Sequence, residues 1–516
     1  MKFSTTCLVI YIIYTKEILF LVQSNPPYVF ERVRLKLKKK KKGDTIQYFP
    51  FSTREKKMKY SKMKCSLYVV LIIFVYPLFV LAGSPVKYLP GFEGPLPFQL
   101  ETGYIGVGEA NEVQLFYYFI KSQSNSKIDP LIYWFTGGPG CSPLSAILYE
   151  LGPITVDIRA YNGSLPTLSL NPYAYTKVAN MIFVDLPVGI GFSYATTQKA
   201  IYSDDLQAAD HAYEFIRKWL IEHQEYLNNP FYVGGDSYSG ITVPIVTQVI
   251  SNGNDMGIKP WINLKGYILG NPVTSTDPDY KYKVPFAHGM GLIPNELYES
   301  FVTNCGRDYS PNDSTNQLCS RDIRTFDWLI NDIYQYHILE SPCELVSHDS
   351  RRSLAGNVQK LKNLSSFFGM KCREEWHELS VIWANDKVVQ DALHVRKTSM
   401  AWERCRSNLS FGTIINNSVS YHANLSRKGF RSLIYSGDHD MVVPFSSTQL
   451  WIKSLNYSII NDWKPWVVDG QVAGYTRSYS NQMTFATVKG GGHTAPEWKR
   501  VECLEMLKRW LSHVSL

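Results

Sequence analysis

The sequence predicts an α/β fold with a largely parallel central sheet, because strand-like and helix-like segments alternate along it. Patterns typical of buried strands cover residues 130–135, 180–185 and 229–234, and each ends at glycine or proline. Between the second and the third, apolar residues recur at helical spacing over 204–220, after Ser203 as the expected helix cap. Strands separated by helices favour parallel pairing through right-handed crossovers.

This alternation is interrupted between about 280 and 425, where helical stretches and polar loops hold five cysteines. Strand patterns resume at 431–436 and 484–488, and an amphipathic helix over 501–511 closes the chain. At 516 residues with 45% hydrophobic content, the chain suits one enlarged core. We therefore expect one α/β domain over 84–516 that carries an inserted cap.

The positive net charge does not indicate a nucleic-acid-binding surface. The whole chain carries +8, but residues 1–64 hold sixteen Lys/Arg against four Asp/Glu, so the remainder carries −4. A nucleic-acid-binding domain concentrates positive charge on its folded part. We expect no nucleic-acid partner.

Residues 58–83 have the three parts of a secretory signal peptide. Lysines follow Met58, an apolar run covers 67–81, and small residues follow up to Gly83. The run is short and contains Pro77, which disfavours the alternative of a signal anchor. We expect no stable membrane span after cleavage.

Residues 1–57 do not fit in front of a signal peptide. We interpret them as a non-native or unstructured extension, with translation beginning at Met58 or Met63. N-terminal sequencing of the native protein tests this interpretation.

The cysteines and sequons behind the signal peptide agree with secretion. Seven cysteines remain, and secretion permits disulfides between them. They form no Cys-x-x-Cys pair or tight Cys/His cluster, so we expect no metal site. Seven Asn-x-Ser sequons predict a glycoprotein: Asn162, Asn312, Asn363, Asn408, Asn416, Asn424 and Asn456.

The segment Phe231-Tyr-Val-Gly-Gly-Asp-Ser-Tyr-Ser-Gly240 is similar to a nucleophile elbow. A strand runs into glycines, then into Ser237, and a helix pattern follows, which would lift the serine oxygen into an open site. Ser239 stands where the G-x-S-x-G motif has its last glycine. An ordinary Ser/Gly loop is the alternative.

A nucleophilic serine needs a base, and the base needs an orienting carboxylate. His493 follows a strand pattern and three glycines, and Asp438 follows another strand pattern. The order Ser237, Asp438, His493 is that of α/β-hydrolases. Asp440 is the nearest rival to Asp438, and spacing does not separate the two.

Five sequence blocks carry a family resemblance. They are Trp134-Phe-Thr-Gly-Gly-Pro-Gly-Cys-Ser142, Phe183-Val-Asp-Leu-Pro-Val-Gly-Ile-Gly-Phe-Ser-Tyr194, Gly235-Asp-Ser-Tyr-Ser-Gly240, Gly437-Asp-His-Asp440 and Gly490-Gly-Gly-His-Thr-Ala-Pro496. In this order they resemble signature blocks of serine carboxypeptidases, over about residues 86–516. The resemblance implies an α/β-hydrolase fold, a mostly parallel sheet with helices on both faces. It also implies Ser237, Asp438 and His493 as the catalytic triad, against Asp440.

The same resemblance implies further roles. The backbone N–H groups of Gly138 and Tyr238 would form the oxyanion hole. The implied disulfides are Cys141–Cys405, Cys305–Cys319 and Cys343–Cys372, with Cys503 unpaired. The segment between Cys343 and Cys372 is basic and loop-like around Arg351-Arg352, so we also predict proteolytic excision there, as occurs in some family members.

The chain departs from the family peptidases where these bind a peptide carboxylate. There an asparagine and a pair of glutamates hold the free carboxylate, and the pair shares a proton at acid pH. This chain has Thr136 at the asparagine position and Asp236 at the first glutamate position, while Glu150 corresponds to the second glutamate. The changes predict weaker binding of a peptide carboxylate.

Other segments, including Ala287–Leu292 and Asp462–Tyr475, resemble the plant acyltransferase branch of the family. The resemblance implies acyl transfer from a 1-O-acyl-β-glucose ester to an acceptor hydroxyl or amine through a Ser237 acyl-enzyme. A serine carboxypeptidase acting at acid pH is the alternative, and a catalytically inactive ligand-binding glycoprotein is the third. The expected partners are the small-molecule donor and acceptor, with no cofactor. The expected location is the vacuole, with the extracellular space as second choice.

Overall fold

The computed structural model describes residues 83–158, 161–275, 280–306, 316–343, 372–396 and 400–516, and the backbone of three short strands before them. The chain divides into two units, Met1–Leu78 and Phe79–Leu516. In the first unit, β1 (Ile13–Tyr14), β2 (Glu17–Val22) and β3 (Val29–Val33) form an antiparallel sheet. The predicted signal peptide, apart from Gly83, and the predicted excision site lie outside the described residues.

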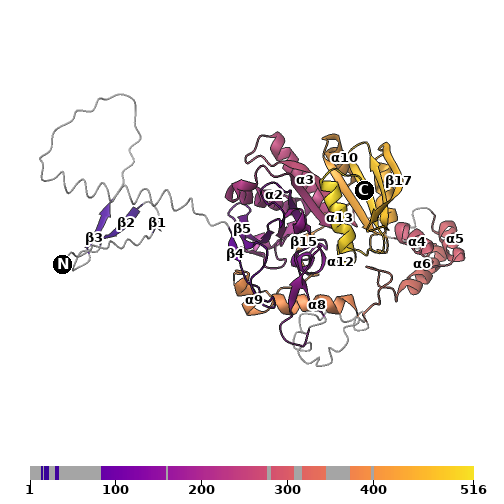
Figure 1. The fold of residues 1–516 in the computed structure, drawn as a ribbon, viewed down its shortest axis with the longest axis horizontal. Coiled ribbons are helices and arrows are strands. Elements are labelled where there is room, and N and C mark those ends of the chain that lie inside the picture. The colour runs from indigo at the N-terminus through magenta and orange to yellow at the C-terminus, as the bar shows by residue number, and fades with distance from the viewer. Residues whose placement is uncertain are drawn as a thin grey trace. The chain divides into compact units, whose positions relative to one another are not determined.

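A twelve-stranded sheet is the framework of the second unit (Figure 1). Its strands run in the order β17-β18-β19-β16-β14-β13-β7-β10-β6-β5-β4, and β11 also pairs with β6. The strands are β4 (Ser84–Val86), β5 (Leu100–Val107), β6 (Val113–Ile120), β7 (Leu131–Phe135), β10 (Asn180–Val184), β11 (Tyr194–Ala195), β13 (Phe231–Asp236), β14 (Leu264–Gly270), β16 (Arg431–Gly437), β17 (Ile459–Val468), β18 (Gln471–Tyr479) and β19 (Met483–Val488). Two small sheets pair β8 (Ile154–Val156) with β9 (Leu168–Leu170) and β12 (Ser203–Asp204) with β15 (Phe411–Gly412).

The centre of the large sheet is parallel, as predicted. The adjacent strands from β10 through β7, β13, β14 and β16 to β19 all pair in parallel. Antiparallel strands extend the sheet at both ends. Five of these parallel strands coincide with the strand patterns read from the sequence. Because carboxyl ends of parallel strands meet at one edge, the loops after β7, β13, β14, β16 and β19 lie together.

Helices cover both faces of this sheet. The described α-helices of this unit are α2 (Asp205–Glu222), α3 (Ser239–Asp255), α4 (Tyr280–Gly289), α5 (Asn295–Asn304), α6 (Gln317–Ile330), α8 (Arg373–Ala384), α9 (Lys387–Ala392), α10 (Val419–Arg427), α11 (Phe445–Ser454), α12 (Ala495–Trp498) and α13 (Arg500–Leu511). Alternate side chains of β7 enter different cores. Ile132 and Trp134 pack in the core that α8 and α13 share, whereas Tyr133 packs in that of α2 and α3.

The cap of helix α2 differs from the prediction. Asp204, not Ser203, is the N-cap, and its Oδ1 accepts hydrogen bonds from the N–H groups of Leu206 (3.0 Å) and Gln207 (2.9 Å). Ser203 and Asp204 both belong to β12, where they pair with Phe411 and Gly412, and the helix begins directly after Asp204. A carboxylate is also favoured at the positive end of the helix dipole.

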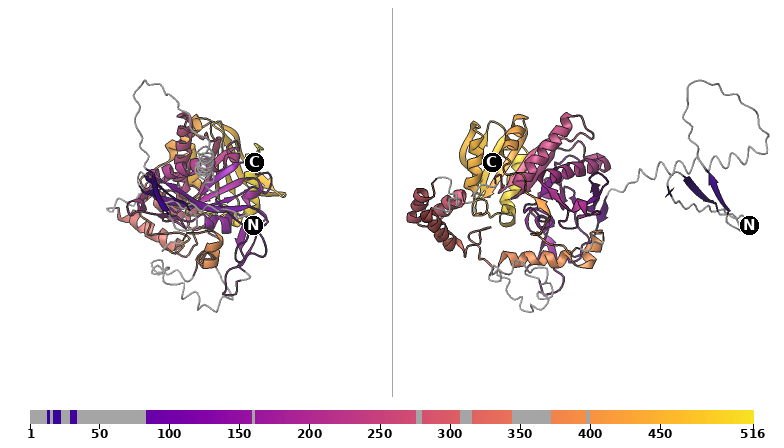
Figure 2. Two further views of the ribbon diagram at one scale, coloured as in Figure 1. Left: turned by 90° about the vertical axis from the view of Figure 1, so that its left-hand side faces the viewer. Right: turned by 180° about the vertical axis from the view of Figure 1, so that it is seen from behind.

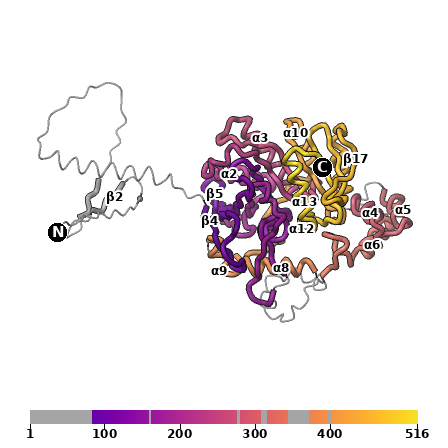
Figure 3. The backbone as a smooth tube through the Cα atoms, viewed as in Figure 1, coloured from indigo at the N-terminus to yellow at the C-terminus, as the bar shows by residue number. Residues whose placement is uncertain are grey.

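The inserted segment forms two parts. Helices α4, α5 and α6 have a small core of their own, which includes Phe301, Phe326 and, from outside the helices, Met441. They form a group at one side of the unit, while α8 and α9 run along another side (Figures 1 and 2). The backbone tube shows the same separation (Figure 3). Leu425 of α10 packs in the core of α3.

In the described part of the chain three disulfides are present, and they are the pairs implied by the resemblance: Cys141–Cys405, Cys305–Cys319 and Cys343–Cys372. Cys141 follows β7, so the first bridge ties the sheet edge to the end of the insertion. Cys503 is buried and unpaired. Within the described ranges, no helix is long and apolar enough to cross a membrane, and the apolar run 67–81 lies outside them.

Candidate active site

Ser237 occupies a tight turn between β13 and α3, as the sequence predicts. Its φ of 55° lies in the left-handed region, which a nucleophile elbow requires of this residue. A Cβ on Gly240 would lie 2.2 Å from the carbonyl oxygen of Val273, and a Cβ on Gly235 would lie 2.6 Å from the Cβ of Ser239. The turn therefore has room only for small residues, and it leaves Ser237 partly exposed.

His493 is the group that contacts the serine oxygen. It lies in the turn between β19 and α12, and its Nε2 is 2.7 Å from Ser237 Oγ. The ring is buried, with the residue 5% exposed. The structure thus brings together a serine and a histidine 256 residues apart, in the geometry in which the imidazole can accept the hydroxyl proton.

Asp440 is the carboxylate that orients His493. Its Oδ2 lies 2.8 Å from His493 Nδ1, and the side chain is fully buried. Its Oδ1 accepts hydrogen bonds from the N–H groups of Val442 (2.7 Å) and Val443 (3.2 Å). These bonds fix the carboxylate, and the carboxylate selects the histidine tautomer that carries its proton on Nδ1.

The prediction of Asp438 as the third member was wrong. Asp438 Oδ1 contacts His439 Nδ1 (2.6 Å) and the N–H of Gly490 (2.7 Å), not His493. The turn that follows β16 directs Asp440 inward to the histidine and Asp438 to the neighbouring glycine loop. The two aspartates are only two positions apart, and no pattern along the chain indicates which of them faces His493.

Asn271 is a site residue that the sequence reasoning missed. Its Nδ2 donates to Asp440 Oδ2 (2.8 Å), and its Oδ1 accepts from the N–H of Gly437 (3.1 Å). It is fully buried, with a φ of 42°. The sequence signal that could have identified it is its position: an asparagine directly after the strand β14, at the edge where the serine and acid loops meet.

The electrostatics of the triad favour a charged imidazole. Burial lowers the pKa of His493, but the charge and hydrogen bond of Asp440 and the charge of Asp236 raise it, with a net upward shift. The imidazolium that forms when the ring takes a proton from Ser237 is therefore stabilised.

The two amides expected to form an oxyanion hole lie at the correct edge. A Cβ on Gly137 would lie 2.5 Å from Ser237 Cβ and 2.9 Å from the nitrogen of Tyr238, so the glycine loop after β7 closes over the elbow. Within the described ranges, neither the N–H of Gly138 nor that of Tyr238 donates to another group. Both donors can therefore serve an external oxyanion.

Two buried carboxyl groups lie beside the serine. Glu150 ends a short π-helical turn, Ala146–Glu150, and Asp236 precedes Ser237. Burial, followed by the charges of Asp236 and Glu497, raises the pKa of Glu150 well above its usual 4.5. Burial also raises the pKa of Asp236, although the hydrogen bond from Glu150 opposes this shift. The pair therefore holds a proton more tightly than two exposed carboxyl groups would.

Several polar atoms near this pair have no partner. Asp236 Oδ1 accepts from the N–H of Gly137 (3.0 Å). Among the residues that the structure describes, no hydrogen-bond partner reaches Asp236 Oδ2, Glu150 Oε2 or the buried Thr136 Oγ1. Buried polar groups are normally satisfied, so these atoms are available to a ligand.

The inserted cap supplies a further residue that the sequence reasoning missed. The carbonyl oxygen of Tyr336 accepts from the N–H of His493 (2.8 Å), and the two rings meet edge to face with centroids 5.3 Å apart. Tyr336 is 45% exposed. Its ring therefore borders the open side of the catalytic histidine, where a substrate can contact it.

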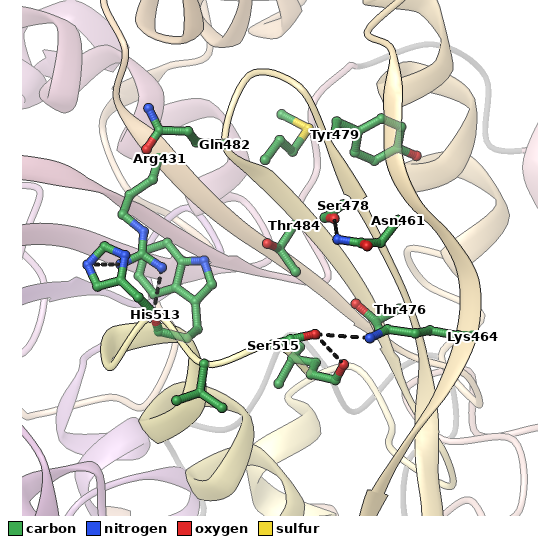
Figure 4. Close-up of a pocket in the computed structure, with 14 residues that line it drawn as sticks. Arg431, Asn461, Lys464, Thr476, Ser478, Tyr479, Gln482, Thr484, His513 and Ser515 are labelled. Atoms are coloured by element: carbon green, nitrogen blue, oxygen red, sulfur yellow. Dashed lines mark hydrogen bonds between the residues drawn. The ribbon is translucent and has the colours of Figure 1, made fainter.

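A cavity of about 280 Å³ lies away from the triad, between the strands β17 to β19 and the end of α13 (Figure 4). Arg431, His513 and Lys464 line it, together with Thr484 and Gln482. Arg431 is already bonded to His513 and to the carbonyl oxygen of Trp510. None of the triad residues lines this cavity.

The described sequon asparagines are all exposed: Asn162, Asn408, Asn416, Asn424 and Asn456. Asn312 and Asn363 lie outside the described residues. In the part of the chain that the structure describes, no group of three His, Cys, Asp or Glu residues could hold a metal ion.

Comparisons with known proteins agree with this architecture. The family model described as serine carboxypeptidase matches residues 90–513. Serine carboxypeptidase-like 19 of Arabidopsis thaliana is 48% identical over 454 residues, covering 86% of this chain and 97% of the relative. Serine carboxypeptidase-like 2 of the same plant is 49% identical over 453 residues, covering 88% and 98%.

A solved structure shows the same fold. The prohormone-processing carboxypeptidase Kex1 of Saccharomyces cerevisiae superimposes with a TM-score of 0.67 at 20% identity, covering 84% of this chain and 97% of that one. The predicted α/β-hydrolase-type fold, a mixed sheet between helices, is confirmed.

Proposed function

Because the chain belongs to the serine carboxypeptidase family, we propose that it is a serine acyltransferase that uses a 1-O-acyl-β-glucose ester as donor. The observation that carries acyl-enzyme chemistry is the hydrogen-bonded series Ser237, His493 and Asp440. The acyl group passes through Ser237 to a hydroxyl or amine of the acceptor. No cofactor takes part in this reaction.

Acylation begins when His493 Nε2 takes the proton of Ser237 Oγ. The oxygen attacks the ester carbonyl carbon, and the N–H groups of Gly138 and Tyr238 stabilise the resulting oxyanion. The bond to the glucosyl oxygen breaks, and His493 returns its proton to this oxygen. Glucose leaves, and Ser237 carries the acyl group.

Transfer reverses these proton movements. His493 deprotonates the acceptor hydroxyl or amine, which attacks the acyl carbon, and the proton then returns to Ser237 Oγ. Water competes with the acceptor at this step. Transfer dominates when the pocket binds the acceptor and excludes water.

Two substitutions favour transfer over peptide hydrolysis. Thr136 offers a hydroxyl where the family peptidases present an amide, and Asp236 is one methylene shorter than the glutamate there. Both changes weaken a site built for a peptide carboxylate. The second candidate, a carboxypeptidase acting at acid pH, is favoured by one feature: Glu150 and Asp236 are both buried, and burial raises the pKa of each.

The test uses the full chain, expressed in a plant host and purified as a glycoprotein. It receives a panel of 1-O-acyl-glucoses with mixed acceptors and, separately, a blocked dipeptide at acid pH. We expect transfer products, read by mass spectrometry, that are absent with Ser237→Ala. A fluorophosphonate probe should label the wild type at Ser237.

Each alternative has its own signature. Serine-dependent release of a C-terminal amino acid without transfer would establish the peptidase. Absence of both labelling and turnover would identify an inactive binding protein. We propose the vacuole as the location, which fractionation of vacuoles from plant cells tests against the extracellular fluid.

A further inference from the structure

We infer that Asp438, together with His439 and His337, forms a clamp that positions His493 by fixing the segment Gly490–Gly492. This inference rests on the proposed function, because it assigns a role beside the proposed nucleophile and base. Asp438 is thus a positioning residue that acts through main-chain contacts.

The segment Gly490–Gly492 needs an external constraint. Three successive glycines have more backbone freedom than any other tripeptide, and His493 follows them directly. A Cβ on Gly492 would lie 2.5 Å from the carbonyl oxygen of Tyr336, so larger residues could not replace this glycine without a shift. Because a larger side chain does not fit at this position, the loop cannot be made more rigid by replacing this glycine.

Asp438 constrains this segment from the turn that follows β16. Its Oδ1 accepts the N–H of Gly490 (2.7 Å), and its own N–H donates to the carbonyl oxygen of Val488 (3.2 Å). His439 adds two contacts: its Nδ1 donates to Asp438 Oδ1 (2.6 Å), and its N–H donates to the carbonyl oxygen of Gly491 (2.9 Å). The turn that carries Asp440 is thereby bonded to the loop that carries the base.

His337 constrains the same segment from the cap. The N–H of Leu339 donates to His337 Nδ1 (3.3 Å), which leaves Nε2 as the nitrogen that donates to the carbonyl oxygen of Gly490 (3.2 Å). The ring of His337 stacks on that of His439, with centroids 5.5 Å apart and planes at 14°. Gly490 is therefore held at its N–H by Asp438 and at its carbonyl oxygen by His337.

The cap backbone completes this arrangement. The N–H of Met441 donates to the carbonyl oxygen of Gln335 (2.9 Å), and the N–H of Ile338 donates to that of His439 (3.1 Å). Main-chain bonds thus join the cap both to the acid turn and, through Tyr336, to His493 itself. Releasing Gly490 would widen the range of positions of the imidazole relative to Ser237 Oγ, and a displacement of about 1 Å can cost about 100-fold in rate.

The test compares Asp438→Ala with Asp462→Ala in the full chain. Asp462 is the control, since its Oδ1 also accepts a main-chain N–H, from Trp463 (2.6 Å), and a side-chain N–H, from Arg477 (2.7 Å). We expect Asp438→Ala to slow fluorophosphonate labelling of Ser237 and kcat by about 10- to 100-fold. KM should stay within about twofold, because Asp438 contacts no substrate. Asp462→Ala should change neither rate.

Rates are expressed per labelled serine, so that a loss of folded protein does not count as a loss of positioning. Asp438→Asn keeps an oxygen that accepts from Gly490, and it should restore labelling to within about threefold of wild type. An Asp438→Ala protein with unchanged kcat per labelled serine would overturn the inference. If Asp438→Ala does not fold, His337→Phe replaces it: this variant keeps a ring but loses the bond to Gly490, and unchanged labelling would overturn the inference equally.

The failure of the proposed function would look different. In that case, wild-type protein would form no transfer product: a peptidase would still label at Ser237 and release a C-terminal amino acid, and an inactive protein would show neither labelling nor turnover. Labelling of wild type with equal rates in all these variants would instead reject only the clamp.

Discussion

At the scale of single residues, the difference between Asp438 and Asp440 decides how the site works. Both carboxylates follow β16, and both bond to a histidine. Only Asp440 is fully buried and bonded to the histidine that contacts Ser237, whereas the Asp438 side chain is 28% exposed. A buried carboxylate fixes the histidine tautomer and stabilises the imidazolium, which an exposed one does less well.

The substitution Asp440→Asn should therefore lower kcat by roughly 10⁴-fold, the effect known for the equivalent change in a serine protease. The amide would stabilise the wrong tautomer of His493, while substrate binding would change little. Steady-state kinetics on the purified variant measure this effect.

Asp438→Asn serves as the comparison for that measurement. A fall in kcat of similar size for Asp438→Asn, with Asp440→Asn active, would restore Asp438 as the triad acid. Thermal unfolding of both variants controls for loss of structure.

At the scale of elements, the helix α2 illustrates why caps are hard to place from sequence. Ser203 and Asp204 are adjacent and both suit an N-cap. Pairing of Ser203 with Phe411 and of Asp204 with Gly412 keeps both residues extended, so the helix begins at Asp205 and Asp204 is its N-cap. The choice thus depends on a strand more than 200 residues away.

Replacing Asp204 with Ala should destabilise the protein by about 1 kcal/mol, because two N–H groups of the first turn lose their acceptor. In a chain of this size, this corresponds to a fall of about 1–2 °C in the thermal midpoint. Calorimetry of the purified glycoprotein measures the change.

Ser203→Ala is the matched control. Within the described residues its hydroxyl has no hydrogen-bond partner, so its loss should change stability by less than about 0.5 kcal/mol. A larger effect of Ser203→Ala than of Asp204→Ala would contradict the observed cap.

At the scale of the whole molecule, buried carboxyl groups should make the folded state more stable in mild acid than at neutral pH. The pKa values of Asp236 and Glu150 are raised from 3.8 and 4.5, and burial raises that of Asp185 to about 7. The folded chain therefore binds these protons more tightly than the unfolded chain does. The stabilisation from these groups is complete at pH values below their pKa values in the unfolded chain. It is lost as the pH rises through their pKa values in the folded chain.

We predict that the free energy of unfolding falls between pH 5 and pH 8, by up to about 1.4 kcal/mol per pH unit for each proton released. Asp236→Asn should flatten this dependence, since it removes one of the two buried carboxyl groups beside Ser237. Thermal midpoints of both proteins across this range test the prediction.

Glu497 has the opposite effect on the pH dependence of stability, because its contribution is lost in strong acid. Burial opposes its ionisation, but His377, Arg373 and Thr494 hold its pKa at about 2. Its contribution is present above pH 4.5 and is lost as pH falls toward 2. A midpoint that rose steadily from pH 5 to pH 8 in wild type would contradict the predicted balance.

Several levels of this protein follow from its sequence alone. Apolar runs at 130–135 and 431–436 and the helical spacing over 204–220 identified the parallel sheet, because local periodicity reports which faces are buried. The elbow around Ser237 was readable because its cramped turn demands small residues in a short segment.

Tertiary structure alone decided which distant groups meet. Asp440 rather than Asp438, the partnership of Asn271, and the contact of Tyr336 with His493 all depend on loops from separate strands and from the cap. Positions along the chain give spacing, but the direction of a side chain in a turn is set by packing and by hydrogen bonds to residues far away in sequence. For this reason the sequence predicted a serine nucleophile with a histidine base, but it could not show which carboxylate orients that base.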